Sequence, residues 1–150
     1  MSKELAKGFI KAGAGCSGTS WNILGQKYFP KACCDASFVF EANSMPGDFF
    51  PVHIHGLQDK LLCVLEGVLD VKLDGQWMKA KPGDLVRMPR GISHGYFNLS
   101  DRPVRALIWV TPAASLQTLF KKLDGVKNVD EVVKLSAQYG MEFLPPEANE

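Results

Sequence analysis

Residues 51–67 read PVHIHGLQDKLLCVLEG, and this stretch decides both the expected fold and the expected site. His53 and His55 are separated by one residue, and alternate residues of a β-strand face the same side of a sheet. Their imidazoles should therefore point together, with backbones ~7 Å apart, so that both can bind one metal ion at ~2.1 Å. The apolar run over residues 60–67 indicates a second strand that begins at Lys60.

Short runs of β-branched, aromatic and other apolar residues, separated by turn signals, continue along most of the chain. The expected strands are residues 37–42, 50–55, 60–67, 68–73, 84–89, 94–99 and 104–110. Asp74-Gly75 marks a hairpin, and Pro82-Gly83 marks the turn into a later strand. Such closely spaced strands, with no long helix between them, predict a mainly β protein with a single antiparallel β-barrel or jelly roll.

The C-terminal part of the chain changes to helical periodicity. Four apolar residues recur at helical spacing within residues 113–123: Leu116, Leu119, Phe120 and Leu123. Pro112 fits the first turn of this helix, and Asn128 with Glu131 forms a capping-box pattern before a second helix that Gly140 would end. We expect one domain over residues 1–150, with a barrel core at about 36–111 and two short helices packed outside it within 113–140.

Composition limits the classes of partner. The 17 basic and 16 acidic residues give a net charge of +1, so the chain offers no electrostatic footprint for nucleic acid or for an anionic membrane. No apolar run is long enough to span a bilayer, and the first residues do not resemble a signal peptide. The four cysteines form no C-x-x-C pair, which favours reduced thiols and a cytoplasmic location.

One further histidine, His94, lies in the segment PGDLVRMPRGISHGYFN, residues 82–98. A single buried histidine is more often satisfied by hydrogen bonds in the core than bound to a metal. Here all three histidines of the chain fall in two short segments punctuated by glycine, which favours a shared metal site. Tyr96 alternates with His94 and should also line the interior.

These two segments resemble the two conserved motifs of the cupin family. The first reads Gly47, five residues, His53-x-His55, and later Gly67; the second reads Gly83, five residues, Pro89-x-Gly91, two residues, His94, three residues and Asn98. The resemblance covers about residues 36–111. It implies a β-barrel with a divalent transition metal (Fe, Ni, Zn, Mn or Cu) held by His53, His55 and His94 from opposite walls, and a homodimer.

Lys60 departs from the cupin pattern, because members of the family usually carry a glutamate ligand at this position. An ammonium group has no lone pair to donate, and it repels a divalent cation. Three interpretations remain: Lys60 bends out to solvent beside a three-histidine site, it lies inside and orients an anionic substrate or exchanges protons, or metal binding is lost. Gln58, or Asp59 through a β-bulge, could supply a replacement oxygen ligand. The family spacing itself places position 60 toward the interior.

The resemblance extends to small cupins that look like quercetin 2,3-dioxygenases. It implies a metal-dependent dioxygenase acting on a small, possibly aromatic or enolisable substrate, with Lys60 and Tyr96 as candidate catalytic residues. The alternative is a non-catalytic cupin that binds or senses a small molecule, since a fold does not fix a function. Six apolar side chains could either receive a flat substrate or form ordinary core: Phe38, Phe40, Phe49, Phe50, Met88 and Trp109.

Overall fold

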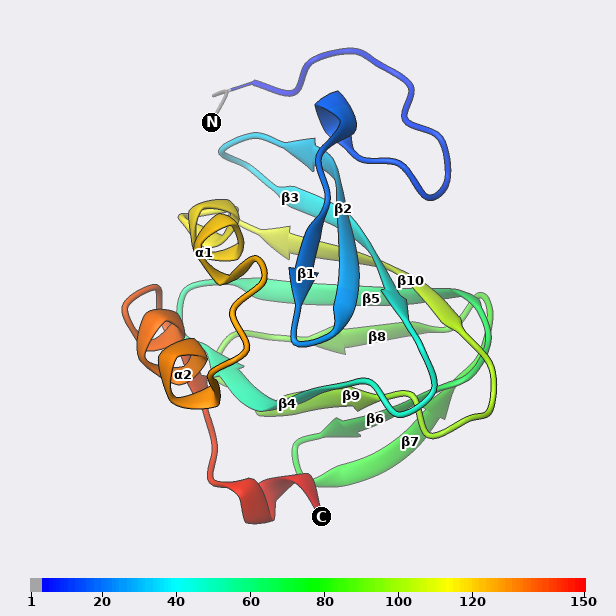
Figure 1. Cartoon of the computed structure of the whole chain (residues 1–150), viewed down its shortest axis with the longest axis vertical. Coiled ribbons are helices and arrows are strands. Elements are labelled where there is room, and N and C mark those ends of the chain that lie inside the picture. The colour runs from blue at the N-terminus through cyan, green and yellow to red at the C-terminus, as the bar shows by residue number, and fades with distance from the viewer. Residues whose placement is uncertain (1–3) are drawn as a thin grey trace.

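The computed structural model describes residues 4–150, which form two antiparallel β-sheets of a jelly roll with two α-helices at one side (Figure 1). The strands of the six-stranded sheet are, in spatial order, β1 (Trp21–Ile23), β2 (Gln26–Cys33), β3 (Phe38–Ser44), β10 (Val104–Thr111), β5 (Asp59–Glu66) and β8 (Leu85–Met88). The strands of the five-stranded sheet are β11 (Met141–Phe143), β4 (Phe49–His55), β9 (His94–Phe97), β6 (Leu69–Leu73) and β7 (Gln76–Ala80). Two short 3₁₀ helices are η1 (Cys16–Gly18) and η2 (Pro146–Asn149).

The predicted mainly β, antiparallel jelly roll is confirmed, but the closed barrel is wrong. Within residues 4–150, no ladder joins the edge strands of one sheet to those of the other. Packing of the two inner faces holds the sheets together instead. On the six-stranded sheet, Phe40, Ile108 and Leu62 are cross-strand neighbours on three adjacent strands, and each is 0% exposed. A seam therefore remains between the sheets where the edge strands end.

The first two strands lie outside the expected barrel core of residues 36–111. Leu24 (φ +50°) and Gly25 (φ +84°) form a two-residue hairpin turn that pairs Ile23 with Gln26. In β2 the register shifts between Pro30 and Ala32, because proline cannot donate a ladder hydrogen bond. This interruption hid the strand pattern of residues 26–33 in the sequence.

Helix α1 (Leu116–Leu123) completes the core, and helix α2 (Val129–Ala137) packs beside it. The Asn128 side chain accepts a hydrogen bond from the Glu131 N–H at 3.1 Å, so the predicted cap is confirmed. Helix α1 begins at Leu116, three residues later than expected, because Ala114 has a non-helical φ of +47°. Within the described residues, no helix is long and apolar enough to cross a membrane.

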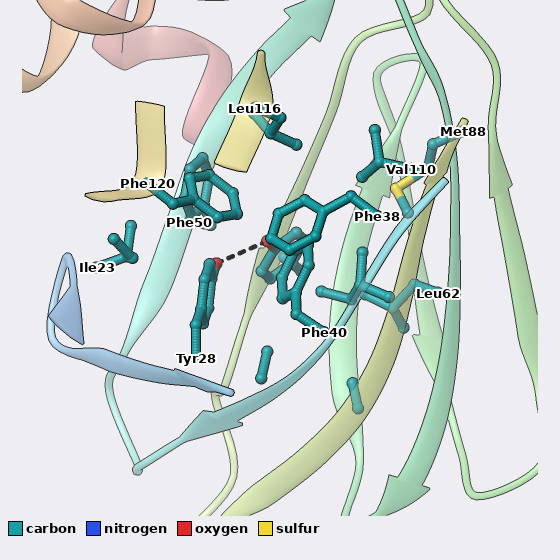
Figure 2. Close-up of a cluster of buried hydrophobic side chains, with 14 of the residues drawn as sticks. Ile23, Tyr28, Phe38, Phe40, Phe50, Leu62, Met88, Val110, Leu116 and Phe120 are labelled. Atoms are coloured by element: carbon teal, nitrogen blue, oxygen red, sulfur yellow. Dashed lines mark hydrogen bonds between the residues drawn. The ribbon is translucent and has the colours of Figure 1, made fainter. Parts of the chain in front are cut away.

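The apolar face of α1 closes one side of the jelly roll with an aromatic cluster (Figure 2). The ring centroid of Phe120 lies 5.3–6.2 Å from those of four other rings: Phe40, Tyr28, Phe38 and Trp21. Leu116 and Leu119 are 1% and 0% exposed. The buried side chains of α1 are thus part of the hydrophobic core of the jelly roll.

Candidate metal centre

Glycines and backbone hydrogen bonds fix the two histidine segments against each other. Gly47 (φ +89°) precedes β4, and Gly91 (φ +81°) precedes β9, so both sit in left-handed conformations that glycine adopts without strain. The Gly91 N–H donates to the His55 carbonyl at 2.9 Å. This bond connects the second histidine of the first motif directly to the turn of the second motif.

The three histidines meet on the inner face of the five-stranded sheet. His53 in β4 and His94 in β9 are cross-strand partners, and His55 lies two residues after His53, on the same side of β4. Their exposed fractions are 0–2%, and the donor atoms of the three residues all lie within 4.8 Å of one another. The three predicted ligands are therefore together, but they come from adjacent strands of one wall rather than from opposite walls.

Backbone carbonyls leave one lone pair free on two of the imidazoles. His53 Nδ1 lies 2.7 Å from the Pro51 carbonyl and His94 Nδ1 lies 3.1 Å from the Ile92 carbonyl. A carbonyl only accepts, so each Nδ1 is the donor and each Nε2 carries a lone pair. His94 Nε2 is buried without a hydrogen-bond partner, and His53 Nε2 lies 3.2 Å from His55 Nε2. A shared metal ion would satisfy these lone pairs.

Burial keeps the imidazoles neutral. It lowers the pKa of His53 and of His94 well below the ordinary histidine value, and it lowers the pKa of His55 to about 3. The nearby positive charge of Lys60 acts in the same direction on all three. Neutral imidazole is the form that binds a metal, and it suits Zn, Fe, Ni or Cu. The donor set fits a divalent transition metal.

Lys60 points into the interior, so the interpretation in which it bends out to solvent is wrong. Its side chain extends from β5 and the residue is 3% exposed. The Nζ atom lies 3.4 Å from Tyr96 Oη, 4.9 Å from the centre of the Tyr96 ring and 5.6 Å from that of Phe50. Burial lowers the pKa of Lys60 to about 7. Near neutral pH the amine can therefore hold or release a proton.

The two possible replacement ligands behave differently. Asp59 faces away from the histidines and forms an ion pair with Arg90, with Oδ2 and Nη2 3.3 Å apart. Gln58 is buried, and its Nε2 donates to the Ala113 carbonyl at 3.3 Å while its Oε1 has no hydrogen-bond partner. Among residues 4–150, no carboxylate or thiolate joins the three histidines. Of Gln58 and Asp59, only Gln58 has a buried side-chain oxygen that could serve as a further metal ligand.

Tyr28 is a residue of this site that the sequence did not reveal. Its Oη lies 3.0 Å from Tyr96 Oη, so the two phenols share a hydrogen bond across the interior (Figure 2, dashed line). Burial raises the pKa of both phenols above the ordinary tyrosine value, which keeps them protonated. Together with Lys60 they form a connected polar chain from β5 through β9 to β2. Because β2 was not predicted, nothing in the sequence placed Tyr28 there.

Most of the apolar residues considered for a substrate pocket are ordinary core. Phe38, Phe40, Phe50 and Met88 are each at most 1% exposed. Phe49 is 45% exposed and stacks on Phe97, with ring centroids 5.5 Å apart. Trp109 occupies an outward position in the alternating burial pattern of β10. The interior around the histidines is thus packed rather than open.

Residues 40–111 match the family model described as Cupin domain. The jelly roll, the two motifs and this match agree, and the chain carries a cupin domain. The resemblance drawn from the motifs is confirmed.

Curated relatives match parts of the chain. Quercetin 2,3-dioxygenase of Bacillus subtilis (strain 168) is 38% identical over 56 residues, which are 37% of this chain and 17% of that protein. Tetracenomycin polyketide synthase protein TcmJ of Streptomyces glaucescens is 27% identical over 79 residues, which are 53% of each chain. The chain therefore spans about half or less of the length of these relatives.

Solved structures support the fold. KdgF from Halomonas sp. superposes with a TM-score of 0.64 at 19% identity, and the match covers 73% of this chain and 99% of that chain. At this identity the likeness concerns the fold alone. A shared fold does not fix the chemistry of a site.

Proposed function

We propose that this chain is a metal-dependent cupin dioxygenase that acts on a small aromatic or enolisable compound, with His53, His55 and His94 as the metal ligands. The observation that carries the proposal is the convergence of three buried, neutral imidazoles within 4.8 Å, with a lone pair of His94 left unsatisfied. Buried polar atoms without a partner are rare and require an explanation. A bound metal ion supplies one.

The names of the relatives support the class of substrate. One matched protein is named a quercetin 2,3-dioxygenase, and another is named a polyketide synthase protein. Flavonols carry an enol on an aromatic framework, and polyketide chains carry 1,3-dicarbonyl groups that enolise readily. Both names are therefore compatible with an enol or enolate as the reacting group.

A divalent transition metal held by the three imidazoles would act as a Lewis acid that binds an enolate and brings it together with dioxygen. Lys60 would act on the substrate first as a base and then as a positive charge. Its neutral amine can accept the enol proton near pH 7, and its ammonium form then stabilises the enolate oxygen. Tyr96, with Oη 3.4 Å from Lys60 Nζ, would donate its phenol hydrogen to the same oxygen.

Oxygen uptake tests this function. The protein is loaded separately with Fe²⁺, Ni²⁺, Mn²⁺, Cu²⁺ or Zn²⁺ and assayed with quercetin and with acetylacetone in an oxygen electrode. We expect uptake that requires both metal and substrate, that disappears in His94→Ala and that falls in Lys60→Met. Lys79→Met is the matched control, because Lys79 is exposed and paired with Asp70 on another strand. Equal rates in the metal-free and metal-loaded protein would contradict the proposal.

A non-catalytic binding or sensor cupin is the second candidate, and the enclosure of the site favours it. The three histidines, Lys60 and Tyr96 are all at most 3% exposed, and an ammonium stands where other cupins carry a carboxylate ligand. Stoichiometric metal without oxygen uptake on either substrate would favour this second function over the dioxygenase.

A further inference from the structure

An open groove of about 1210 Å³ lies beside the candidate metal centre. Its walls come from the β1–β2 turn, the segment between α1 and α2, helix α2, the first half of β4 and the C-terminal tail. Strand β11 pairs only with residues 53–55 of β4, so Phe49 and Pro51 extend past the end of β11. The groove thus follows the seam that a closed barrel would not have.

Two residues that line the groove contact His53, one of the candidate metal ligands. Phe143 lines the groove, and its ring centroid lies 5.7 Å from that of His53 and 5.6 Å from that of Phe50. Pro51 also lines the groove, and its carbonyl accepts the hydrogen bond from His53 Nδ1 at 2.7 Å. His53 itself is 0% exposed. Phe143 and Pro51 are therefore the wall between the groove and the imidazole.

The composition of the walls determines which ligands suit the groove. The side chains that line it are mostly apolar: Leu24, Phe49, Val129, Val133, Phe143 and Leu144. Phe49, Val129 and Val133 are 39–65% exposed, so a ligand would cover apolar surface that now faces water. Lys127 and Asp130 are the charged residues of the lining, one of each sign. Ligand sites of this type bind apolar molecules and use a few polar groups for orientation.

We propose that this groove is the ligand-binding site that serves the metal centre, and that it takes a planar, uncharged aromatic compound with an enol or phenol hydroxyl. Phe143 is the side chain that such a ligand must displace to bring its hydroxyl to the histidines. The inference rests on the proposed metal centre for the destination of the ligand. The groove itself does not depend on a bound metal.

The test uses 2-naphthol as the probe and two measurements on the full chain. Its fluorescence reports binding to the metal-free protein, and the visible spectrum of bound Co²⁺ reports whether its hydroxyl reaches the metal. Val133→Trp fills the groove from an exposed helix position, and Val129→Trp repeats the obstruction one turn earlier. Leu85→Trp is the matched control, because Leu85 is 55% exposed and does not line the groove.

We expect either groove variant to weaken 2-naphthol binding at least about tenfold through lost apolar contact, and the control to change it less than about twofold. Phe143→Ala should make the 2-naphthol-induced change in the Co²⁺ spectrum faster, and Phe143→Leu should restore slower kinetics. Undiminished binding in both tryptophan variants would overturn the proposal, as would the absence of 2-naphthol binding to the wild type.

A second copy of the chain is the other possible occupant. A wild-type dimer that Val133→Trp converts to a monomer, with unchanged affinity for 2-naphthol, would assign the groove to the dimer contact and overturn the proposal.

The two measurements separate this inference from the function on which it rests. Failure of the wild type to take up Co²⁺, with groove-dependent 2-naphthol binding intact, would contradict the metal centre and leave the groove as a ligand site. Normal Co²⁺ uptake, together with an affinity for 2-naphthol that the groove variants do not change, would contradict the proposed ligand site. It would leave the metal centre in place.

Discussion

The two sheets contribute opposite chemistry to one interior. The five-stranded sheet carries all three imidazoles, on β4 and β9, and therefore supplies lone pairs. The six-stranded sheet faces them with the ammonium of Lys60 on β5 and the phenol of Tyr28 on β2. Three converging imidazoles do not by themselves set the affinity for a metal ion. Charge on the opposite sheet opposes the binding of a cation.

Protonation of Lys60 therefore competes with metal binding. The ammonium form repels a divalent cation, whereas the neutral amine does not. Because burial brings the pKa of Lys60 to about 7, the balance between the two forms changes near neutral pH. A metal ion would favour the neutral amine, so metal affinity should rise as the pH rises through 7.

Removing one ligand from the five-stranded sheet should have the largest effect. We expect His53→Ala, His55→Ala or His94→Ala each to lower Zn²⁺ affinity by at least about 100-fold, since three imidazoles share one ion. The effects should be strongly non-additive, because the first loss already dismantles the site. Calorimetric titration measures the affinity, and the variant that lacks all three histidines is the blank. A single variant with wild-type affinity would remove that residue from the ligand set.

Changing the charge on the six-stranded sheet should have the next largest effect. Lys60→Glu replaces a repelling charge with a carboxylate ligand, so we expect Zn²⁺ affinity to rise at least about tenfold, which needs only about 1.4 kcal/mol. Lys60→Met should fall between the wild type and Lys60→Glu, because it removes the repulsion without adding a ligand. Unchanged affinity in Lys60→Glu would show that the opposite sheet does not control the site.

A charge on the buried face of α1 should lower stability without changing metal binding. Leu119 lies on the buried face of α1 and is 0% exposed, so Leu119→Asp should lower the free energy of unfolding by about 2–4 kcal/mol. Thr118→Asp, at an exposed position of the same helix, is the control. Chemical denaturation measures the difference, and Zn²⁺ stoichiometry of the folded fraction should stay the same. A Leu119→Asp protein as stable as the control would place the helix free in solvent.

Lys60 should also make the stability of the metal-free protein depend on pH. Its pKa is about 7 when folded and near its ordinary value of 10.5 when unfolded, so the unfolded chain binds more protons between these values. Stability should therefore rise with pH above 7, by about 2 kcal/mol between pH 7 and pH 9. Lys60→Met should flatten this rise, and the exposed-site control Lys79→Met should keep it. A wild-type profile without the rise would mean that Lys60 is not buried as an amine.

Much of the fold could be predicted from local patterns, and its closure could not. Alternating apolar runs and glycine turns gave strands near their observed positions from residue 38 onward, and Asn128 with Glu131 marked the start of α2. Strand β2 was missed because Pro30 interrupts its pattern. The open seam was missed because pairing between the edges of two sheets depends on long-range geometry, which no local sequence pattern records.

The candidate site divides in the same way. Period-two alternation placed His53 and His55 on one face, and the motif spacing added His94 and the inward direction of Lys60. Sequence could not show that β4 and β9 are neighbours in one sheet, or that Tyr28 would meet Tyr96 across the interior at 3.0 Å. Those facts depend on strands far apart in the chain. They also decide which wall supplies the ligands and which supplies the charge.

The most direct test of the central claim, that the five-stranded sheet forms a metal site despite the lysine opposite, is the Zn²⁺ content per chain. The protein is saturated with Zn²⁺ at pH 8, where Lys60 is mostly neutral, then dialysed and measured by elemental analysis together with the variant lacking all three histidines. We predict one retained ion per wild-type chain and none in the variant. A wild-type chain that retains no ion, or a variant that retains as much as the wild type, would contradict the claim.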